Sequence, residues 1–511
     1  MFVRKKNNAS GVISIQILEK RNGKSHLVKT IGSSSDSDEV ELLFQKGKQW
    51  IKRYKGEIDL FDQSNIDELE ENAVNDFLSN IESVLINGTQ LLLEKVYNSI
   101  GFNDLCDDIL KHLVTARLSQ PLSKSGTVAY LKAHFDEDIH YQKIYRYMDK
   151  LYNSRQDEIQ RISVEHTRKI LGGSIGLLFY DVTTLYFETD HGDDLREKGF
   201  SKDGKHAQPQ IVLGLLVSRD GYPLSYSIFN GSQYEGRTMI PIVDDFIRKN
   251  NLDDFVIVAD SGLLNKRNLT LLEASGYKYI LGGRIKSVSD KEKEWILSLE
   301  RKEGVFHERT VNNHRIIIGY SEKRAKKDHY NREKGINRLK KEFGRGKLTK
   351  DHVNKKGYNK FLELSNDINV KINEEKIKED EKWDGLKSYI TNTDLPATEV
   401  YEQYCGLWVI ERAFRVTKGT IELRPMFHFT PRRIEAHVAI CFVAYKVYKE
   451  LERIIKVKKI DLSVDKVIEI AKTITTIKIR LPNKNKTLKK TLLITPLQQK
   501  IASLLDENIS H

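Results

Sequence analysis

The sequence predicts a multidomain α/β protein, and three observations support this fold class. The chain has 511 residues, more than one ordinary hydrophobic core holds, so we expect roughly two to four domains. Hydrophobic residues make up 39% of the chain, which is enough for folded cores and excludes wholesale disorder. Short apolar runs alternate with helical patterns over residues 174–285, as in sheets that are covered by helices.

Several protein classes are excluded by what the sequence lacks. No apolar stretch approaches the roughly 18 residues that a membrane-spanning helix needs. No apolar segment follows the basic start of the chain, so we do not expect a signal peptide. The cysteines Cys106, Cys405 and Cys441 are scattered and show no CxxC spacing. We therefore expect a cytoplasmic protein with reduced thiols and no structural zinc.

Residues 1–60 are predicted to form a small β-rich module. Apolar residues recur over Val12–Leu18, and the pair Asn22-Gly23, a typical hairpin turn, precedes another strand-like run. A helical pattern near residues 38–54 follows.

Residues 61–170 are predicted to form a helical domain that is a candidate for DNA binding. Breaks at residues 121–126 and 136–138 interrupt the helical patterns, and a run rich in Tyr, Lys and Arg follows over residues 141–150. A short turn followed by a basic helix is what a helix-turn-helix motif requires. A plain helical bundle has similar breaks, so both interpretations remain open.

Two aspartates follow predicted strands in residues 171–289, where the expected order is β-β-β-α-β-α-β. Asp181 follows the apolar run Ile175–Tyr180, and Asp260 follows Phe255–Ala259. In α/β sheets, side chains at the carboxyl ends of strands face the ligand-binding crevice. Burying an unpaired carboxylate is costly, and a Mg²⁺ or Mn²⁺ ion bound by oxygen ligands would offset that cost. The alternative, in which each Asp caps a turn, remains open.

Residues 290–395 form a highly charged region in which the charge is uneven. The segment 321–360 holds 15 Lys and Arg against five Asp and Glu, and residues 321–346 are predicted to form a long basic helix. The whole chain carries a net charge of +12, which favours a polyanionic partner, nucleic acid first. A solvated helix face explains an isolated charge run equally well, but this concentration favours a surface that faces nucleic acid.

One predicted helix, residues 397–418, carries an unusual stripe of side chains. At roughly 100° per residue, a sector of about 80° contains one carboxylate, two aromatic rings and two cations. These residues are Tyr404, Trp408, Glu411, Arg415 and Lys418. Cations contact phosphates and aromatic rings stack on bases, so the stripe fits a metal-binding Glu beside DNA contacts better than a solvated face.

The rest of residues 396–455 is predicted to be helical, with a helix that starts at Pro431. The tail, residues 456–511, is predicted to add a helix, a hairpin around Leu481–Lys484 and a last short helix. We expect this tail to serve in dimerisation or DNA contact.

The acidic residues resemble the DDE triad of bacterial insertion-sequence transposases. The three acids are Asp181, Asp260 and Glu411. The stripe is similar to the Tyr-x2-Arg-x3-Glu-x6-Lys signature of the IS4-type group. Tyr404, Glu411 and Lys418 match this signature, and Leu407 stands where it has Arg, so that one phosphate or structural contact is missing or moved.

Three further segments look closest to the IS1634 branch of that group: YDVTT at 180–184, VADSGLL at 258–264 and PRRIEAH at 431–437. The resemblance implies a ribonuclease H-like catalytic core in two parts, residues 171–289 and 396–455. It also implies that residues 290–395, which separate Asp260 from Glu411, are an insertion domain whose basic segment faces DNA.

The resemblance implies a transposase that cleaves DNA at the inverted-repeat ends of an insertion sequence and joins those ends to target DNA. The triad would bind two Mg²⁺ or Mn²⁺ ions, with Asp181 bridging both. The implied partners are double-stranded DNA, as terminal inverted repeats and as target, and a second copy of the chain on the paired ends. The implied location is the cytoplasm of a bacterium or archaeon, at the nucleoid.

The implied DNA contacts extend the stripe. They comprise Tyr404, Trp408, Arg415 and Lys418, with Arg237 and Lys266 as further candidates near the metals. For Arg237 and Lys266, a role as ordinary surface residues remains open.

Three other functions compete with this interpretation. A ribonuclease H-like nuclease would cut DNA without joining it, and an inactive or domesticated relative would bind DNA only. A phosphatase-type metal hydrolase would act on small substrates, which fits poorly with the basic segment 321–360 and the aromatic stripe.

Overall fold

The computed structural model describes most of the chain, as two compact units. The described residues are 1–9, 11–21, 23–55, 71–201, 204–311, 313–345, 349, 352–354, 357–365, 369–423, 426–481 and 486–505. One unit comprises Met1–Val84 with Ile477–Lys490, and the other comprises Leu85–Thr476 with Thr491–His511.

The N-terminal module consists of a three-stranded antiparallel sheet and one helix. Its elements are β1 (Phe2–Asn7), β2 (Ile13–Arg21), β3 (Lys24–Ser34) and α1 (Ser37–Tyr54), with strand order β1-β2-β3. Ile15 and Ile17 on β2 are fully buried, and Gly47 lets α1 approach Val3 and Ile15 closely. The expected strands and helix are therefore present, while Asn22 of the expected turn lies outside the described residues.

A second small sheet joins distant parts of the sequence in the order β16-β15-β4. Its strands are β4 (Ile81–Leu85), β15 (Thr475–Leu481) and β16 (Lys486–Leu492). The expected C-terminal hairpin is present, with residues 482–485 of its turn outside the described part. The expectation that residues 61–170 are helical is wrong at β4. Its partner strand lies almost 400 residues away, where the Arg480 guanidinium binds Glu82 at 2.7 Å, so local patterning could not show it.

The larger unit is organised around an eight-stranded mixed sheet in the order β10-β11-β14-β9-β8-β5-β6-β7. The strands are β5 (Leu177–Tyr186), β6 (Gln210–Ser218), β7 (Pro223–Asn230), β8 (Val256–Ala259), β9 (Lys278–Gly283), β10 (Phe306–Val311), β11 (His314–Tyr320) and β14 (Leu386–Thr391). β5, β8 and β9 run parallel to one another, and the other neighbours pair antiparallel. The expected order β-β-β-α-β-α-β is confirmed over β5 to β9.

Helices cover both faces of this sheet, because its central strands alternate between two hydrophobic cores. Leu178 and Ile257 face a core shared with α8 (Met239–Asn250) and α9 (Lys266–Ala274). Phe179 and Val258 face the other core, which includes residues of the helices that follow β14. Those helices are α13 (Ala397–Cys405), α14 (Trp408–Lys418) and α15 (Pro431–Val457).

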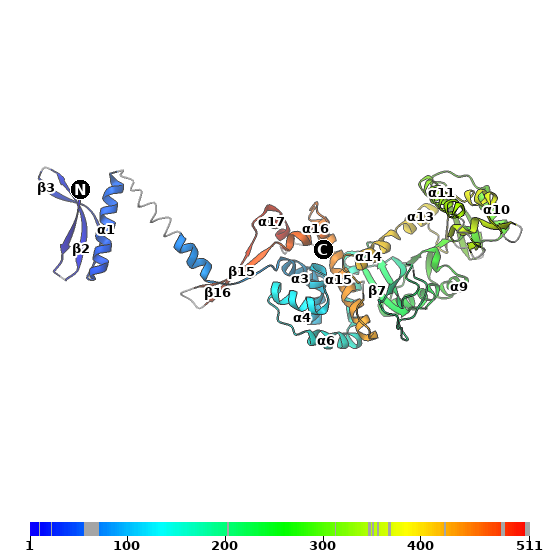
Figure 1. The fold of residues 1–511 in the computed structure, drawn as a ribbon, viewed down its shortest axis with the longest axis horizontal. Helices are drawn as coiled ribbons and strands as arrows, with labels where there is room; N and C mark the ends of the chain where they lie inside the picture. Colours follow the sequence, from blue (N-terminus) through cyan, green and yellow to red (C-terminus); the bar gives the residue numbers. More distant parts are fainter. Residues whose placement is uncertain are drawn as a thin grey trace. The chain divides into compact units, whose positions relative to one another are not determined.

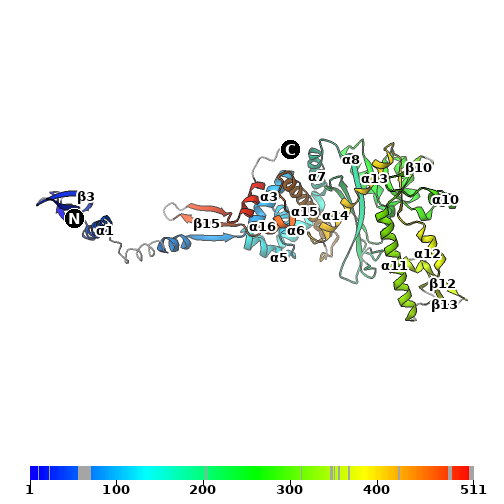
Figure 2. The ribbon, with the colours of Figure 1, turned by 90° about the horizontal axis from the view of Figure 1, so that it is seen from above.

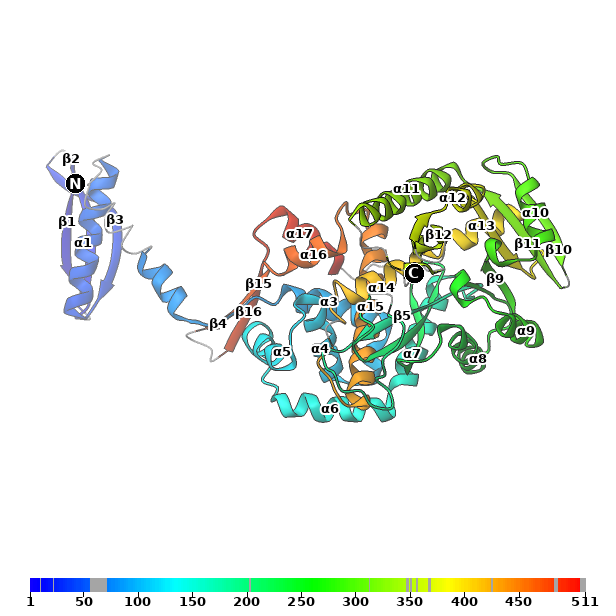
Figure 3. The same ribbon diagram turned by 45° about the vertical axis from the view of Figure 1, so that its right-hand side comes forward.

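Residues 290–395 contribute three strands to the same sheet, since β11 pairs with β14 and β14 pairs with β9. Figure 3 shows β10 and β11 side by side, and β14 separates β11 from β9 in the strand order. The remaining elements of this segment are α10 (Asp290–Ser298), α11 (Glu322–Gly344), β12 (Leu362–Ser365), β13 (Asn369–Ile372) and α12 (Glu374–Glu381). The long basic helix is present as α11, which lies near the β12–β13 hairpin (Figure 2).

The helical region packs around α15, which contacts α3, α4 and α6 (Figure 1). Its helices are α3 (Gly88–Ile100), α4 (Asp108–Ser119), α5 (Lys124–Tyr130), α6 (Tyr141–Ser154) and α7 (Gln156–Ile170), followed near the C-terminus by α16 (Val464–Ala471) and α17 (Pro496–Ala502). The expected breaks before α5 and α6 are present. Among the described residues, no helix is long and apolar enough to cross a membrane.

Candidate active site

Asp181 and Asp260 lie side by side on the two central parallel strands. Tyr180 pairs with Ala259 in the β5–β8 ladder, so each aspartate stands one residue beyond a paired position. Neighbouring strands are about 5 Å apart, which makes the two aspartates neighbours across the sheet.

Asp260 follows β8 directly, as expected, but the expectation that Asp181 follows its strand is wrong. β5 continues to Tyr186, because its far half pairs antiparallel with β6, where Asp181 stands opposite Leu215. The Asp181 carboxylate also accepts a hydrogen bond from the backbone N–H of Val182 at 2.7 Å. The acid is therefore held within a strand that has neighbours on both sides.

The phenol of Tyr404 is bound to the second aspartate. Its hydroxyl donates a hydrogen bond to Asp260 Oδ1 at 2.8 Å, and the side chain is only 3% exposed. Burial raises the pKa of the Tyr404 phenol, and the negative charge of Asp260 raises it further. Tyr404 thus remains a neutral hydrogen-bond donor at ordinary pH and orients the Asp260 carboxylate.

The predicted helix 397–418 is divided in the structure. α13 ends at Cys405 and α14 begins at Trp408, with Gly406 and Leu407 forming a turn between them. A Cβ at position 406 would lie 2.5 Å from the ring of Phe179, so the break is where the helices meet β5. Phe179 and Asp181 lie on the same face of β5 because strand side chains alternate. α14 therefore packs on the strand that carries Asp181.

The helix break divides the predicted stripe into two parts. Tyr404, on α13, is buried against the sheet, whereas Trp408, Glu411 and Arg415 are exposed on α14. Their spacing of three and four residues puts these three side chains on one face. Lys418 is half-buried at the end of α14. Leu407, at the signature's Arg position, is 8% exposed and belongs to the main hydrophobic core.

The three acids fit a hard cation by their chemistry, since carboxylate oxygens are the ligands that Mg²⁺ and Mn²⁺ prefer. Asp181 and Asp260 are neighbours, and the exposed Glu411 side chain can change rotamer without disturbing the core. Within the described part of the chain, however, no three His, Cys, Asp or Glu side chains lie close enough together to form a metal-binding group.

Lys387, which the sequence analysis did not select, joins the site from β14. Its ammonium lies 4.3 Å from the centre of the Tyr404 ring. Burial lowers the pKa of Lys387, the charge of Arg324 lowers it further, and Asp260 and Glu411 oppose this shift. One ammonium thus interacts with both acids. The only sequence signal was a lysine between apolar residues in the strand Leu386–Thr391.

Arg284 is a second residue that the sequence analysis missed. It follows β9 and donates hydrogen bonds to the backbone oxygens of Ser261 (2.9 Å) and Gly262 (3.1 Å). These contacts place a guanidinium beside the turn that follows Asp260.

Arg237 and Lys266 are both exposed, and the structure links the segments that carry them. Arg237 lies in the turn Glu235–Arg237, which contacts the turn Ser261–Leu263 directly after Asp260. Lys266 is the first residue of α9, whose capping residue Asn265 donates a hydrogen bond to the Gly236 oxygen at 3.2 Å. Both cations therefore lie on segments that border the end of β8.

Comparisons with known proteins complete the description of this site. Residues 172–446, more than half of the chain, match a family described as "Transposase DDE domain". One similar solved structure is "Cryo-EM structure of piggyBac transposase synaptic complex with hairpin DNA", with TM-score 0.38 and 10% identity over 82% of this chain and 77% of that one. Another is "Mos1 transposase paired-end complex with left transposon end", with TM-score 0.16 and 11% identity over 31% and 53%. No curated protein matches the chain.

Proposed function

Because the chain belongs to the transposase DDE domain family and is a transposase, we propose that it cuts DNA at the inverted-repeat ends of an insertion sequence. We propose further that it joins those ends to target DNA. The observation that carries this proposal is that Asp181 and Asp260 each follow directly after the last paired residues of β5 and β8, with α14, the helix of Glu411, packed on β5.

Asp181, Asp260 and Glu411 are proposed to hold two divalent cations, Mg²⁺ or Mn²⁺. Such ions activate a water or a 3′-hydroxyl and stabilise the leaving oxygen of a phosphodiester. Tyr404 orients Asp260 through its hydrogen bond. The exposed Trp408 and Arg415 stand on the same face as Glu411, where a ring can stack on a base and a guanidinium can bind a phosphate. Lys418, Arg237 and Lys266 are proposed as further phosphate contacts.

Finer assignments rest on the same residues. We propose a ribonuclease H-like core from residues 171–289 and 396–455, which the strand order β7-β6-β5-β8-β9 supports. We propose an IS4-type enzyme near the IS1634 branch, which the spacing of Tyr404, Glu411 and Lys418 supports. The buried Leu407 accounts for the missing Arg, because a charge at this point of the core would be costly.

The proposed partners are double-stranded DNA and a second copy of the chain, because both ends of an element must be processed together. The helical region and the C-terminal tail are proposed to contact DNA or the second copy. A cytoplasmic location is supported by three free thiols, two of them exposed, since exposed thiols persist in reducing compartments.

The test uses end-labelled linear DNA that carries the gene's own flanking sequences, incubated with Mg²⁺ or Mn²⁺ and analysed on a denaturing gel. The wild type is expected to cut at the element boundary and, with a target plasmid added, to form joined products. Glu411→Gln is expected to abolish both reactions, whereas Glu399→Gln, the same change at an exposed position of α13, is expected to retain them.

Two outcomes would contradict the proposal. Binding of this DNA by the wild type without cleavage under any metal would reduce the protein to a DNA-binding relative. Cleavage without joined products would leave a nuclease.

A further inference from the structure

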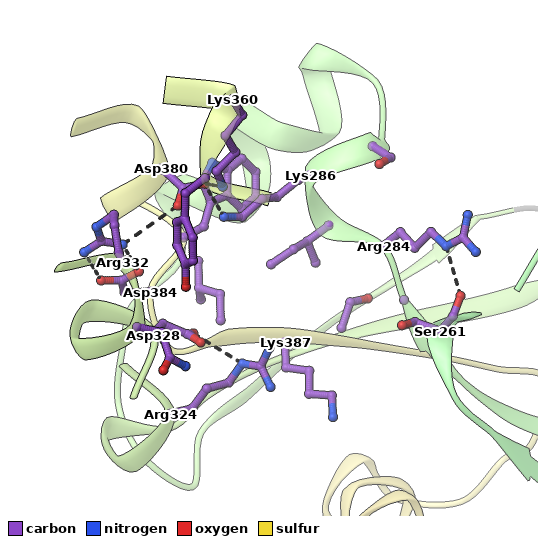
Figure 4. A pocket seen from close by; sticks show the side chains of 18 residues that line it. Ser261, Arg284, Lys286, Arg324, Asp328, Arg332, Lys360, Asp380, Asp384 and Lys387 are labelled. Atoms are coloured by element: carbon purple, nitrogen blue, oxygen red, sulfur yellow. Dashed lines mark hydrogen bonds and ion pairs between the residues drawn. The ribbon is translucent and has the colours of Figure 1, made fainter. Parts of the chain in front are cut away.

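A charged cavity of about 430 Å³ lies beside the proposed active site. Its wall is built from the turn after Asp260, the segment that follows β9, the first half of α11, and β14 (Figure 4). Ser261, the neighbour of Asp260, lines it, and so does Lys387. The cavity therefore borders the residue next to Asp260.

Cations outnumber carboxylates in the lining of this cavity. The cations are Arg284, Lys286, Arg324, Arg332, Lys360 and Lys387, and the carboxylates are Asp328, Asp380 and Asp384. Asp384 binds Arg332 through two contacts of 2.6 Å. Asp380 is shared by Lys286 at 2.6 Å and Lys360 at 2.7 Å. Two carboxylates thus offset two of the three positive charges at one end of the cavity.

The rest of the lining retains an excess of positive charge. Arg324 has one carboxylate, Asp328, at 3.5 Å, and among the described residues the Arg284 guanidinium binds backbone oxygens alone. Among the residues that the structure describes, no carboxylate lies within 4.0 Å of the Lys387 ammonium, whose contacts are aromatic rings. A half-buried ammonium with no anion in direct contact is costly, and a phosphate oxygen would compensate it.

We propose that this cavity binds one backbone phosphate of the DNA strand that is cut, through Lys387 and Arg324. This inference rests on the proposed function, because it places the phosphate next to the scissile one.

A DNA strand fits this place better than free phosphate does. Lys387 and Arg324 also line an adjoining cavity of about 450 Å³ between β10, β11 and α13. Cations that border two cavities suit a continuous chain that passes from one to the other.

The experiment replaces single phosphates near the cut by neutral methylphosphonates, one position at a time, and measures binding of the full-length protein to the flanking DNA. A charged hydrogen bond lost at one phosphate is expected to weaken wild-type binding on the order of ten-fold. Lys387→Met is expected to bind unmodified DNA about as weakly as the wild type binds DNA with that phosphate neutralised. Neutralising the same phosphate is expected to weaken binding by Lys387→Met no further. Arg324→Gln is expected to behave in the same way.

Lys291→Met is the matched control, because Lys291 is exposed on α10 and does not line the cavity. It is expected to keep the wild-type pattern. Thermal melting of each variant establishes that it is folded. If Lys387→Met does not fold, Arg324→Gln tests the inference in its place.

Two results would overturn the inference. One is full wild-type sensitivity at every phosphate in the cavity variants. The other is displacement of the DNA by millimolar inorganic phosphate in the wild type but not in Lys387→Met, which would assign the cavity to a free anion. Cleavage by the wild type is measured separately. If the proposed function fails, neutral phosphates still weaken DNA binding by the wild type, but no cut product forms.

Discussion

At the scale of single residues, the bond between Tyr404 and Asp260 is the most informative contact of the site. Because the pKa of the buried Tyr404 phenol is raised, the phenol keeps its proton and acts as a hydrogen-bond donor to Asp260. It therefore restricts the rotation of a carboxylate that is otherwise exposed at the end of β8.

Tyr404→Phe removes this donor and leaves the ring in place. Hydrogen bonds to charged groups contribute about 1.5–3 kcal/mol, so we expect single-turnover cleavage to slow by roughly 10- to 100-fold. Tyr389→Phe is the control, since the Tyr389 ring packs against Tyr404 at 4.9 Å and loses the same atom. Equal rates for Tyr404→Phe and wild type would show that the bond does not position Asp260.

Glu450 illustrates a residue whose charge stabilises the fold. It is 1% exposed on α15, where it accepts a hydrogen bond from the Tyr222 hydroxyl at 3.0 Å and an ion-pair contact from Arg453 at 2.7 Å. Burial opposes ionisation, but His166 at 3.7 Å and the Arg453 guanidinium outweigh it and lower the pKa of Glu450 to about 2.

A carboxylate whose pKa falls on folding stabilises the protein above its usual pKa of 4.5. We expect this contribution, about 3 kcal/mol, to disappear as the pH falls from 4.5 toward 2. Glu450→Gln should therefore lower the free energy of unfolding at pH 7, and its difference from wild type should shrink in that window. Thermal unfolding as a function of pH measures this effect. The control is Glu165→Gln, at an exposed position of α7, and a pH-independent difference would contradict the assignment.

At the scale of elements, the break between α13 and α14 separates the buried Tyr404 from the exposed Glu411. Glycine is the only residue type that fits at position 406, because a Cβ there would lie 2.5 Å from the ring of Phe179. The turn lets Tyr404 face Asp260 while α14 presents Glu411 on its exposed side.

Gly406→Ala is expected to destabilise the protein by about 1–3 kcal/mol, as overpacking does, and to slow cleavage by displacing α14 from β5. Phe179→Leu in the same chain should restore part of the loss by making room. Thermal unfolding and cleavage assays check both effects. Gly176→Ala is the control, because a Cβ there would meet nothing within 4 Å. Additive losses in the double variant would refute the steric explanation.

Sequence patterns predicted most elements of the large sheet. They failed where the conformation of a segment depends on residues far away in the sequence. Asp181 was expected after its strand, but pairing with β6 extends β5 past it. Ile81–Leu85 was expected to be helical, but pairing with β15 makes it a strand. The helix 397–418 was expected to be continuous, and contact with Phe179 accompanies its break. In each case a residue far away in the sequence determines the local conformation.

At the scale of the whole molecule, the charged segment 290–395 does not stand apart from the eight-stranded sheet. β11 and β14 extend the sheet beyond β9, so that the basic helix α11 follows directly from the strand β11. A surface of positive charge is thereby attached to the sheet that carries Asp181 and Asp260.

If α11 binds DNA phosphates, affinity is expected to fall steeply with salt. Lys326, Lys327 and Lys334 are exposed on α11. Changing all three to Gln should reduce the slope of log affinity against log salt by up to about 2.7, at about 0.9 for each phosphate contact. Changing them to Arg keeps the charge and should keep the slope. Fluorescence anisotropy from 50 to 200 mM salt measures both, and an unchanged slope in the Gln variant would exclude this surface.

The sequence by itself determined the family, the alternation of strands and helices around Asp260, and the three acids that we propose as ligands, because short motifs and local periodicity encode these features. Only the tertiary structure decided that Asp181 and Asp260 follow neighbouring paired residues of β5 and β8, that Tyr404 binds Asp260, and that Lys387 faces the same site. These contacts join residues up to 144 positions apart. Their geometry depends on strand pairing and core packing, which no local pattern of residues specifies.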